Sequence, residues 1–120
     1  MNHKQRLELI RHFFETKCIP TLEAKGHDYT NGTIKDDPNA NFKIVGDMLH
    51  MSPLMTWAVY FMKHITAIIT FVNGTDLKSE SINERILDAI NYLFILYTML
   101  EDESTIAKAK GIDISTMGGE

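Results

Sequence analysis

The sequence predicts an all-α protein, a small bundle of four to five helices that assembles into an oligomer. Apolar residues recur at helical spacing through most of the chain, and few stretches alternate in the way of a β-strand. Residues that suit helix caps precede the later apolar segments. The 120 residues fit one compact domain, expected over residues 1–110, and residues 111–120 form an expected C-terminal tail.

The first expected helix covers residues 2–17. Its apolar face is formed at helical spacing by Leu7, Ile10, Phe13 and Phe14. Ile19-Pro20 is expected to interrupt this helix, because proline disfavours the helical conformation in the residue before it, and a short second piece follows through Ala24. Residues 25–37 form an expected loop, since two glycines and several Asn and Asp residues favour turns.

Three later helices are predicted from their caps. Asp37-Pro38 and Ser52-Pro53 each resemble an N-cap followed by proline at the first helical position. The first opens a helix to about Leu49. The second opens a helix that ends near Asn73-Gly74, where Asn and Gly suit a C-terminal cap. Ser81-Ile-Asn-Glu84 fits a capping box and opens a last long helix, to about residue 103.

The helix over residues 53–73 is apolar on almost every side, which is typical of a helix buried on more than one face. One small bundle can hardly bury it so fully, so we expect a homo-oligomer with this helix or its neighbour at the interface. The segment is long enough to cross a bilayer. Lys63 and His64 lie at its centre, where charge in a membrane is costly, so we expect no membrane span.

Charge and cysteine content exclude several classes of function. The net charge of −4 and pI of about 5.7 argue against a nucleic-acid partner, because such binding needs a basic surface. Cys18 is the single cysteine, so no intrachain disulfide and no cysteine zinc site is expected. The N-terminus shows no secretory signal pattern. These features together favour a cytoplasmic location.

A first candidate site lies in the middle of the apolar helix. At 100° per residue, Trp57, Tyr60 and His64 share one narrow sector, and Lys63 lies on its edge. Aromatic rings beside a cation and an imidazole could stack a base and hold a phosphate. The alternative is a core histidine with a satisfied hydrogen bond and a lysine whose amine extends to solvent.

A second candidate is an acidic stripe. Glu80, Glu84, Asp88 and Asn91 follow one another at spacings of four, four and three, so they share one face of a helix. Carboxylates one turn apart could hold Mg²⁺, which prefers oxygen ligands and often binds phosphate as well, and Glu84 with Asp88 is the candidate metal pair. The alternative is the solvated face of an amphipathic helix.

A third candidate is the start of the expected loop. Lys25, Asp28 and Tyr29 could line the mouth of a pocket, and Asn41 follows in the next helix. The alternative is an ordinary polar surface loop anchored by a tyrosine.

These residues together form a pattern that covers roughly residues 22–103. In chain order it is Lys25-Gly-x-Asp28-Tyr29, Asn41-Phe42, Trp57-x-x-Tyr60-x-x-Lys63-His64-x-x-Ala67-Ile68 and Glu80-x-x-x-Glu84-Arg85-Ile86-x-Asp88-Ala89-x-Asn91-Tyr92-Leu93. The pattern resembles the nucleotide modification associated domain 1 family, small helical proteins common in bacteriophages and prophages. The resemblance implies a link to nucleotide metabolism. Many relatives have Asp just before the helix lysine, where this chain has Met62, so it resembles a Lys-His-x-x-Ala-Ile branch.

From this we expect a phage-type protein that binds a nucleotide or a nucleotide-derived small molecule, and that sequesters a nucleotide signal of host defence. Lys63 and His64 are expected at the phosphate, with Trp57, Tyr60 or Tyr29 at the base. The expected contacts to the ribose, the base edge or a metal are Glu84, Asp88 and Asn91. No cofactor is needed by such a binder.

Two alternatives stay open. One is a Mg²⁺-dependent nucleotide-processing enzyme, either one that modifies nucleotides or one similar to the MazG-type pyrophosphatases, which hold Mg²⁺ with four carboxylates on two helices. The other is a helical interaction module that has no ligand and whose polar residues bridge subunits.

Overall fold

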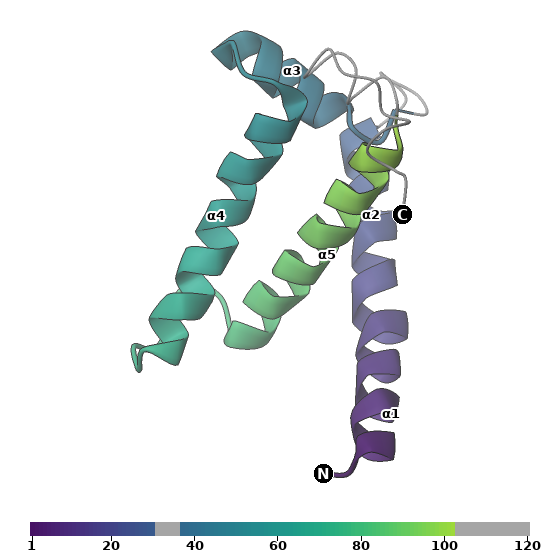
Figure 1. The fold of residues 1–120 in the computed structure, drawn as a ribbon, viewed down its shortest axis with the longest axis vertical. Helices are drawn as coiled ribbons and strands as arrows, with labels where there is room; N and C mark the ends of the chain where they lie inside the picture. Colours follow the sequence, from purple (N-terminus) through teal and green to yellow (C-terminus); the bar gives the residue numbers. More distant parts are fainter. Residues whose placement is uncertain (31–36, 103–120) are drawn as a thin grey trace. The chain divides into compact units, whose positions relative to one another are not determined.

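The computed structural model describes residues 1–30 and 37–102, with no strand among them, which confirms the all-α class (Figure 1). The chain divides into two compact units, with the boundary between Pro38 and Asn39, and each is described by itself. The expectation of a single domain over residues 1–110 stays a prediction, and the expected tail 111–120 lies outside the described residues.

Unit 1 is one continuous helical run. It consists of α1 (His3–Phe13), a π-helical turn η1 (Phe14–Cys18) and α2 (Ile19–Thr30) (Figure 1). Asn2 caps α1 because its side chain accepts a hydrogen bond from the Gln5 amide at 2.8 Å. The Gln5 side chain accepts one in return from the Asn2 amide, also at 2.8 Å.

The prediction of a break at Ile19-Pro20 was wrong, because the helix continues past the proline. In an α-helix the ring of Pro20 would clash with the carbonyl four residues earlier. Here the Ile19 amide donates to the Phe14 carbonyl, five residues earlier, and this wider turn precedes the proline. The expected loop start at Lys25 was also wrong, since α2 continues to Thr30: once nucleated, a helix adds residues of only moderate propensity.

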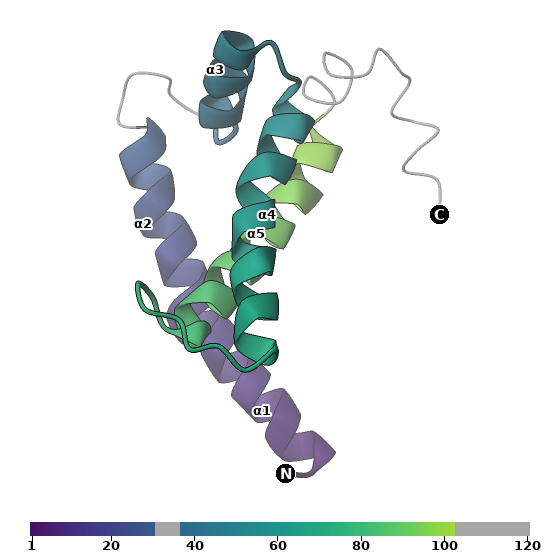
Figure 2. The same cartoon turned by 90° about the vertical axis from the view of Figure 1, so that its left-hand side faces the viewer.

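Unit 2 contains α3 (Ala40–Leu49), α4 (Pro53–Val72) and α5 (Ile82–Glu101), and α4 and α5 run antiparallel (Figures 1 and 2). Two of the predicted N-caps are confirmed, and of the capping box expected at Ser81-Ile-Asn-Glu84 the structure shows the bond to the serine hydroxyl. The Ser52 hydroxyl accepts from the Met55 amide at 3.0 Å, and the Ser81 hydroxyl accepts from the Glu84 amide at 3.2 Å. α4 ends as expected, with Asn73 as its C-cap.

α3 begins two residues later than the predicted Asp37-Pro38 cap. Asn39 stands at its N-cap position but makes no side-chain capping bond. Its buried amide nitrogen instead donates to a carboxylate oxygen of Asp102 at 3.2 Å. This bond joins the start of α3 to the end of α5, so the helix start depends on a tertiary contact.

The core of unit 2 is small and aromatic. Phe42 of α3, Trp57 of α4 and Met99 of α5 are its buried members. Their partly buried neighbours in the core are Leu54, Ala58, Tyr60, Phe61, Tyr92, Ile95 and Leu96. The core therefore holds all three helices of the unit together.

α4 is long and apolar enough to cross a membrane, judged by length and composition among the described residues. Only 17% of its apolar window is buried within the chain. The expectation that the protein has no membrane span stays a prediction.

Candidate functional site

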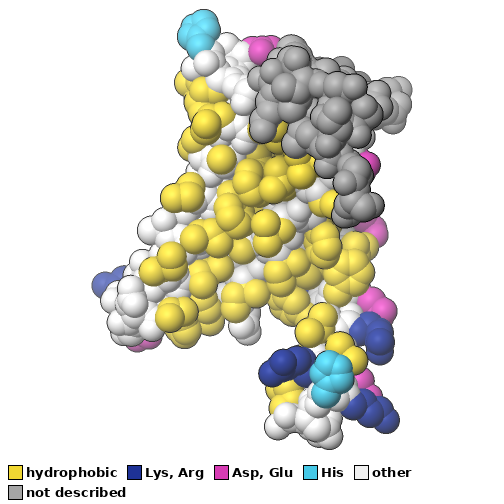
Figure 3. Space-filling view, in the orientation of Figure 1, with side chains coloured by type: hydrophobic (Ala, Val, Ile, Leu, Met, Phe, Trp, Pro, Cys, Tyr) yellow, Lys and Arg dark blue, Asp and Glu magenta, His cyan; other side chains and the backbone are white. Residues whose placement is uncertain are grey.

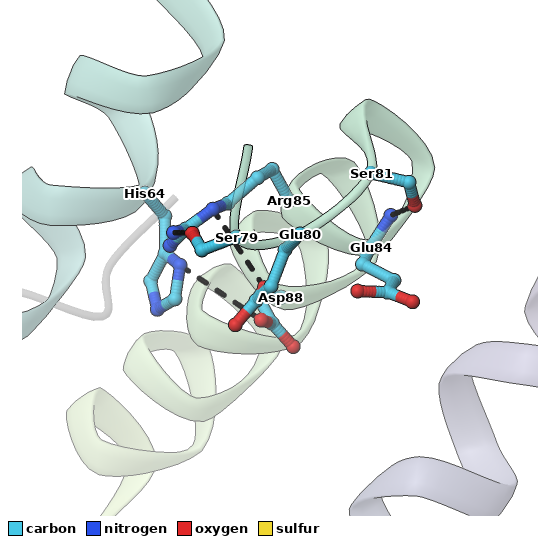
Figure 4. Close-up of polar contacts among 7 residues, drawn as sticks. All are labelled: His64, Ser79, Glu80, Ser81, Glu84, Arg85 and Asp88. Carbon is cyan, nitrogen blue, oxygen red and sulfur yellow. Dashed lines mark hydrogen bonds and ion pairs between the residues drawn. The ribbon is translucent and has the colours of Figure 1, made fainter. Parts of the chain in front are cut away.

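A cluster of charged and polar side chains lies between α4 and the first turns of α5. We call His64, Glu80, Arg85 and Asp88 the polar cluster. Figure 4 shows His64 extending from α4 toward Arg85 and Asp88 of α5, with Glu80 arriving from the segment just before α5. The cluster thus brings together a residue of the first candidate site and residues of the second.

His64 is the buried member from α4, with a relative exposure of 6%. Its Nδ1 lies 3.9 Å from Oδ2 of Asp88, beyond hydrogen-bond distance, and its ring lies 5.0 Å from the ring of Tyr92 between centroids. Asp88 itself is only partly buried. The structure thus places His64 and Asp88 next to each other, and their role in one binding site stays a prediction.

The electrostatic surroundings keep the imidazole neutral. Burial lowers the pKa of His64 below its ordinary value, and the positive charges of Lys63 and Arg85 lower it further, while the carboxylates of Asp88 and Glu80 raise it in part. A neutral imidazole carries one N–H donor and one acceptor nitrogen. His64 therefore offers a hydrogen-bond partner of either kind at neutral pH.

Arg85 is the member that sequence reasoning did not assign to the site. Its Nε lies 3.6 Å from Oε2 of Glu80, and its terminal Nη2 donates to the Ser79 hydroxyl at a long 3.4 Å. A signal was available in the sequence, because Arg85 precedes Asp88 by three residues and shares a helical face with it.

The other residues of the first candidate site differ in burial, since some lie at the surface and one lies in the core. Lys63 is exposed and Tyr60 is partly buried. Trp57 is 8% exposed, stacks on Phe61 with ring centroids 4.7 Å apart, and donates its indole N–H to the Tyr92 carbonyl at 2.8 Å. The indole is thus a member of the core, and its role in stacking a base stays a prediction.

The acidic stripe is also divided. Glu84 is exposed, and Figure 4 shows its carboxylate on the other side of Asp88 from His64. Asn91 is buried on α5. The described residues contain no group of three or more His, Cys, Asp or Glu side chains that could hold a metal ion, and the assignment of Glu84 and Asp88 to a metal stays a prediction.

The remaining predicted residues lie elsewhere. Asn41 is partly buried on α3 of unit 2. Lys25 is exposed on α2 of unit 1, and Asp28 and Tyr29 belong to the last turn of that helix. The third candidate site is therefore described on two separate units, and its assembly stays a prediction.

The polar cluster can recognise an anion that also presents hydroxyl groups. Arg85 and the exposed Lys63 supply positive donors, the neutral His64 supplies a donor and an acceptor, and Asp88 supplies acceptor oxygens. Phosphate and ribose together have this combination of groups. Searches against protein families, curated proteins and solved structures gave no match for this chain, so the resemblance to the nucleotide modification associated family stays a prediction.

Proposed function

We propose that the protein binds a nucleotide or nucleotide-derived small molecule at the polar cluster and holds it without changing it. Lys63, His64 and Arg85 contact the phosphate in this proposal. The protein acts as a homo-oligomer in the cytoplasm of a bacterial host and, as a phage-type protein, sequesters a nucleotide signal of host defence.

The observation that supports the proposal is that two buried polar atoms of the cluster lack hydrogen-bond partners among the described residues. Neither Nδ1 of His64 nor Nε of Arg85 has a hydrogen-bond partner among the described residues, although both atoms are buried. Leaving such a group unsatisfied costs about 1–3 kcal/mol, so an incoming acceptor or donor regains that free energy. A ligand that satisfies both atoms would therefore bind in preference to water.

The charges at the site favour a phosphate as that ligand. Arg85 is held by Glu80 through a 3.6 Å ion pair, and the Glu80 side chain is 40% exposed. The Arg85 side chain is only 15% exposed, so the exposed member of the pair is Glu80. The Glu80 side chain can move out into water, and a phosphate that takes its place can bond the guanidinium with two oxygens. The exposed Lys63 is free to swing over the same phosphate on its long side chain.

The nucleoside part is assigned to Tyr60, Asp88 and Asn91. Tyr60 has ring surface available for a base, whereas stacking on Trp57 would require the core to open. Asp88 accepts hydrogen bonds from ribose hydroxyls, and Asn91, one turn further along α5, adds an amide for the base edge.

Calorimetric titration of the full chain with nucleotides and cyclic nucleotides, with and without Mg²⁺, tests this proposal. We expect Lys63→Ala to weaken binding about 10–100-fold, as for the loss of one charge-assisted hydrogen bond. Lys78→Ala is the matched control, since Lys78 is an exposed lysine outside the cluster. Equal affinity in the two variants, or no binding of any nucleotide, would contradict the proposal.

Chromatography of the titrated mixture separates the binder from the enzyme. Recovery of intact ligand supports sequestration. A Mg²⁺-dependent product that disappears in Asp88→Ala would instead establish the nucleotide-processing alternative, because that reaction needs a carboxylate at the metal.

A further inference from the structure

The outward side of α4 carries an apolar surface that the described residues of unit 2 leave exposed. We call Met55, Val59, Met62, Thr66 and Ile69 the outer stripe. Its four apolar members are each 54–59% exposed, and Thr66 is exposed as well. Figure 3 shows how widely hydrophobic side chains gather over α4 and α5 on one face of the molecule.

The outer stripe lies opposite the side of α4 that packs on α5. Trp57 and His64 are buried on the inner side. At 3.6 residues per turn, Met55 and Met62 point roughly 140–160° away from Trp57 around the helix axis. A helix that is apolar on two opposite sides needs a partner on each, and among the described residues of unit 2 only the inner side has one.

The spacing of the stripe identifies the partner as a helix. Successive members are separated by four, three, four and three residues, which is the repeat by which two helices pack along their length. The stripe covers 15 residues, or about four helical turns. A partner helix therefore needs an apolar face of similar length.

Charge and length together favour a second α4. Lys63 is the single charged residue of this helix and lies at the edge of the stripe, so the matching face must also be free of charge. α4 meets that condition and has the right length. The exposed apolar face of α1, formed by Leu7, Ile10 and Phe14, is only about two turns long and belongs to a helix rich in charge. The exposed apolar residues of α5 at Leu93, Tyr97 and Leu100 cover only about two turns before Glu101.

We propose that α4 pairs through the outer stripe with the outer stripe of a second copy of this chain. The same surface on both copies gives a closed two-fold dimer. A specific interface removes at least about 1,000 Å² from water in total, and each copy contributes four apolar side chains that are more than half exposed. This pairing does not depend on the ligand of the polar cluster.

Light scattering after size-exclusion chromatography tests the pairing on the full chain. We expect wild type at twice the chain mass of 13.7 kDa or a higher even multiple, and Met62→Glu at half the wild-type mass. Met48→Glu is the matched control: Met48 is 74% exposed on α3, outside the stripe, and its variant should keep the wild-type mass. Far-ultraviolet circular dichroism checks that each variant stays helical.

Disulfide formation is a second measurement, and it detects the pairing without disrupting the interface. Met62 lies at the centre of the stripe, so Met62→Cys should form a covalent dimer under mild oxidation whether the helices run parallel or antiparallel. Wild type, whose one cysteine Cys18 is buried, and Met48→Cys should give none. If Met62→Glu does not fold, this experiment decides.

Three results would overturn the proposal. The first is a monomeric wild type, as would follow if the chain covered the stripe itself. The second is an oligomer that keeps its mass in Met62→Glu and forms no Met62→Cys disulfide. The third is a monomer that floats with phosphatidylcholine vesicles in a sucrose gradient, which would assign the stripe to a lipid surface.

Discussion

Replacing Gly46 by alanine should destabilise the protein, although the same change stabilises most helices. A β-carbon at this position would lie 2.6 Å from the Met51 carbonyl oxygen and 2.9 Å from the Thr56 hydroxyl. The Met51 amide also donates to the Gly46 carbonyl at 2.8 Å, which ties the two segments together at this point. The close approach of α3 to the start of α4 therefore depends on the missing side chain.

The expected magnitude is the balance of two opposing effects. Alanine is favoured over glycine inside a helix by about 1 kcal/mol. Overpacking a tight contact costs about 1–3 kcal/mol, and here the nearest atom is backbone, which cannot rotate away as a flexible side chain can. A backbone oxygen at 2.6 Å puts the cost in the upper part of that range, about 2–3 kcal/mol. After subtraction of the helix gain, we expect Gly46→Ala to lower the free energy of unfolding by about 1–2 kcal/mol.

Urea unfolding at one fixed protein concentration measures this change, because oligomerisation would otherwise shift the midpoint. Asp47→Ala is the matched control, since Asp47 is the next residue of α3 and is exposed. Its variant should be unchanged or more stable by a few tenths of a kcal/mol. A Gly46→Ala variant as stable as wild type would refute the close packing of α3 against α4.

The other predictions concern the core and the polar cluster. The pKa of His64 in the folded chain is lowered from 6.5, so the unfolded chain binds more protons at mildly acidic pH. The stability that this residue contributes is therefore present above about pH 6.5 and is lost as the pH falls. Urea unfolding at a series of pH values should show a smaller loss of stability on acidification in His64→Gln than in wild type. Trp57→Phe removes the indole bond to the Tyr92 carbonyl and should cost about 1–3 kcal/mol by the same assay; a change within error would contradict the core position of Trp57. Asn39→Ala breaks the bond to Asp102 and should cost about 1–2 kcal/mol, whereas a cost that is the same in an Asp102→Ala background would exclude their direct coupling.

The parts of the fold that depend on local chemistry could be predicted from the sequence. Ser52 and Ser81 bond amides three residues away, so their caps needed no knowledge of the rest of the chain. The start of α3 could not be predicted in this way. Asn39 bonds Asp102, 63 residues further along, and that contact exists only after the helices have packed.

Pro20 illustrates a different limit. The residue does disfavour an α-helix, as expected, but a π-helical turn just before it changes the hydrogen-bond pattern and lets the helical run continue. Such a turn has no strong sequence pattern of its own.

The sequence predicted which side of α4 carries the site residues, but it did not predict which of them the core would bury. Helical periodicity correctly placed Trp57 and His64 on one side of α4, and both are buried there. Periodicity could not show that the Trp57 indole would pack in the core, nor that Arg85 would face His64. Both depend on how α4 and α5 are rotated against each other.

The most direct test of the ligand site is a nitrogen NMR spectrum of the imidazole side chains during nucleotide titration. His64 is identified by the signal that disappears in His64→Gln, and the exposed His3, His12 and His50 serve as internal controls. We expect a nucleotide to shift the His64 signal and to raise the pKa of His64, since a nearby phosphate favours the protonated ring. A His64 signal that no nucleotide changes, or changes confined to the exposed histidines, would contradict this expectation.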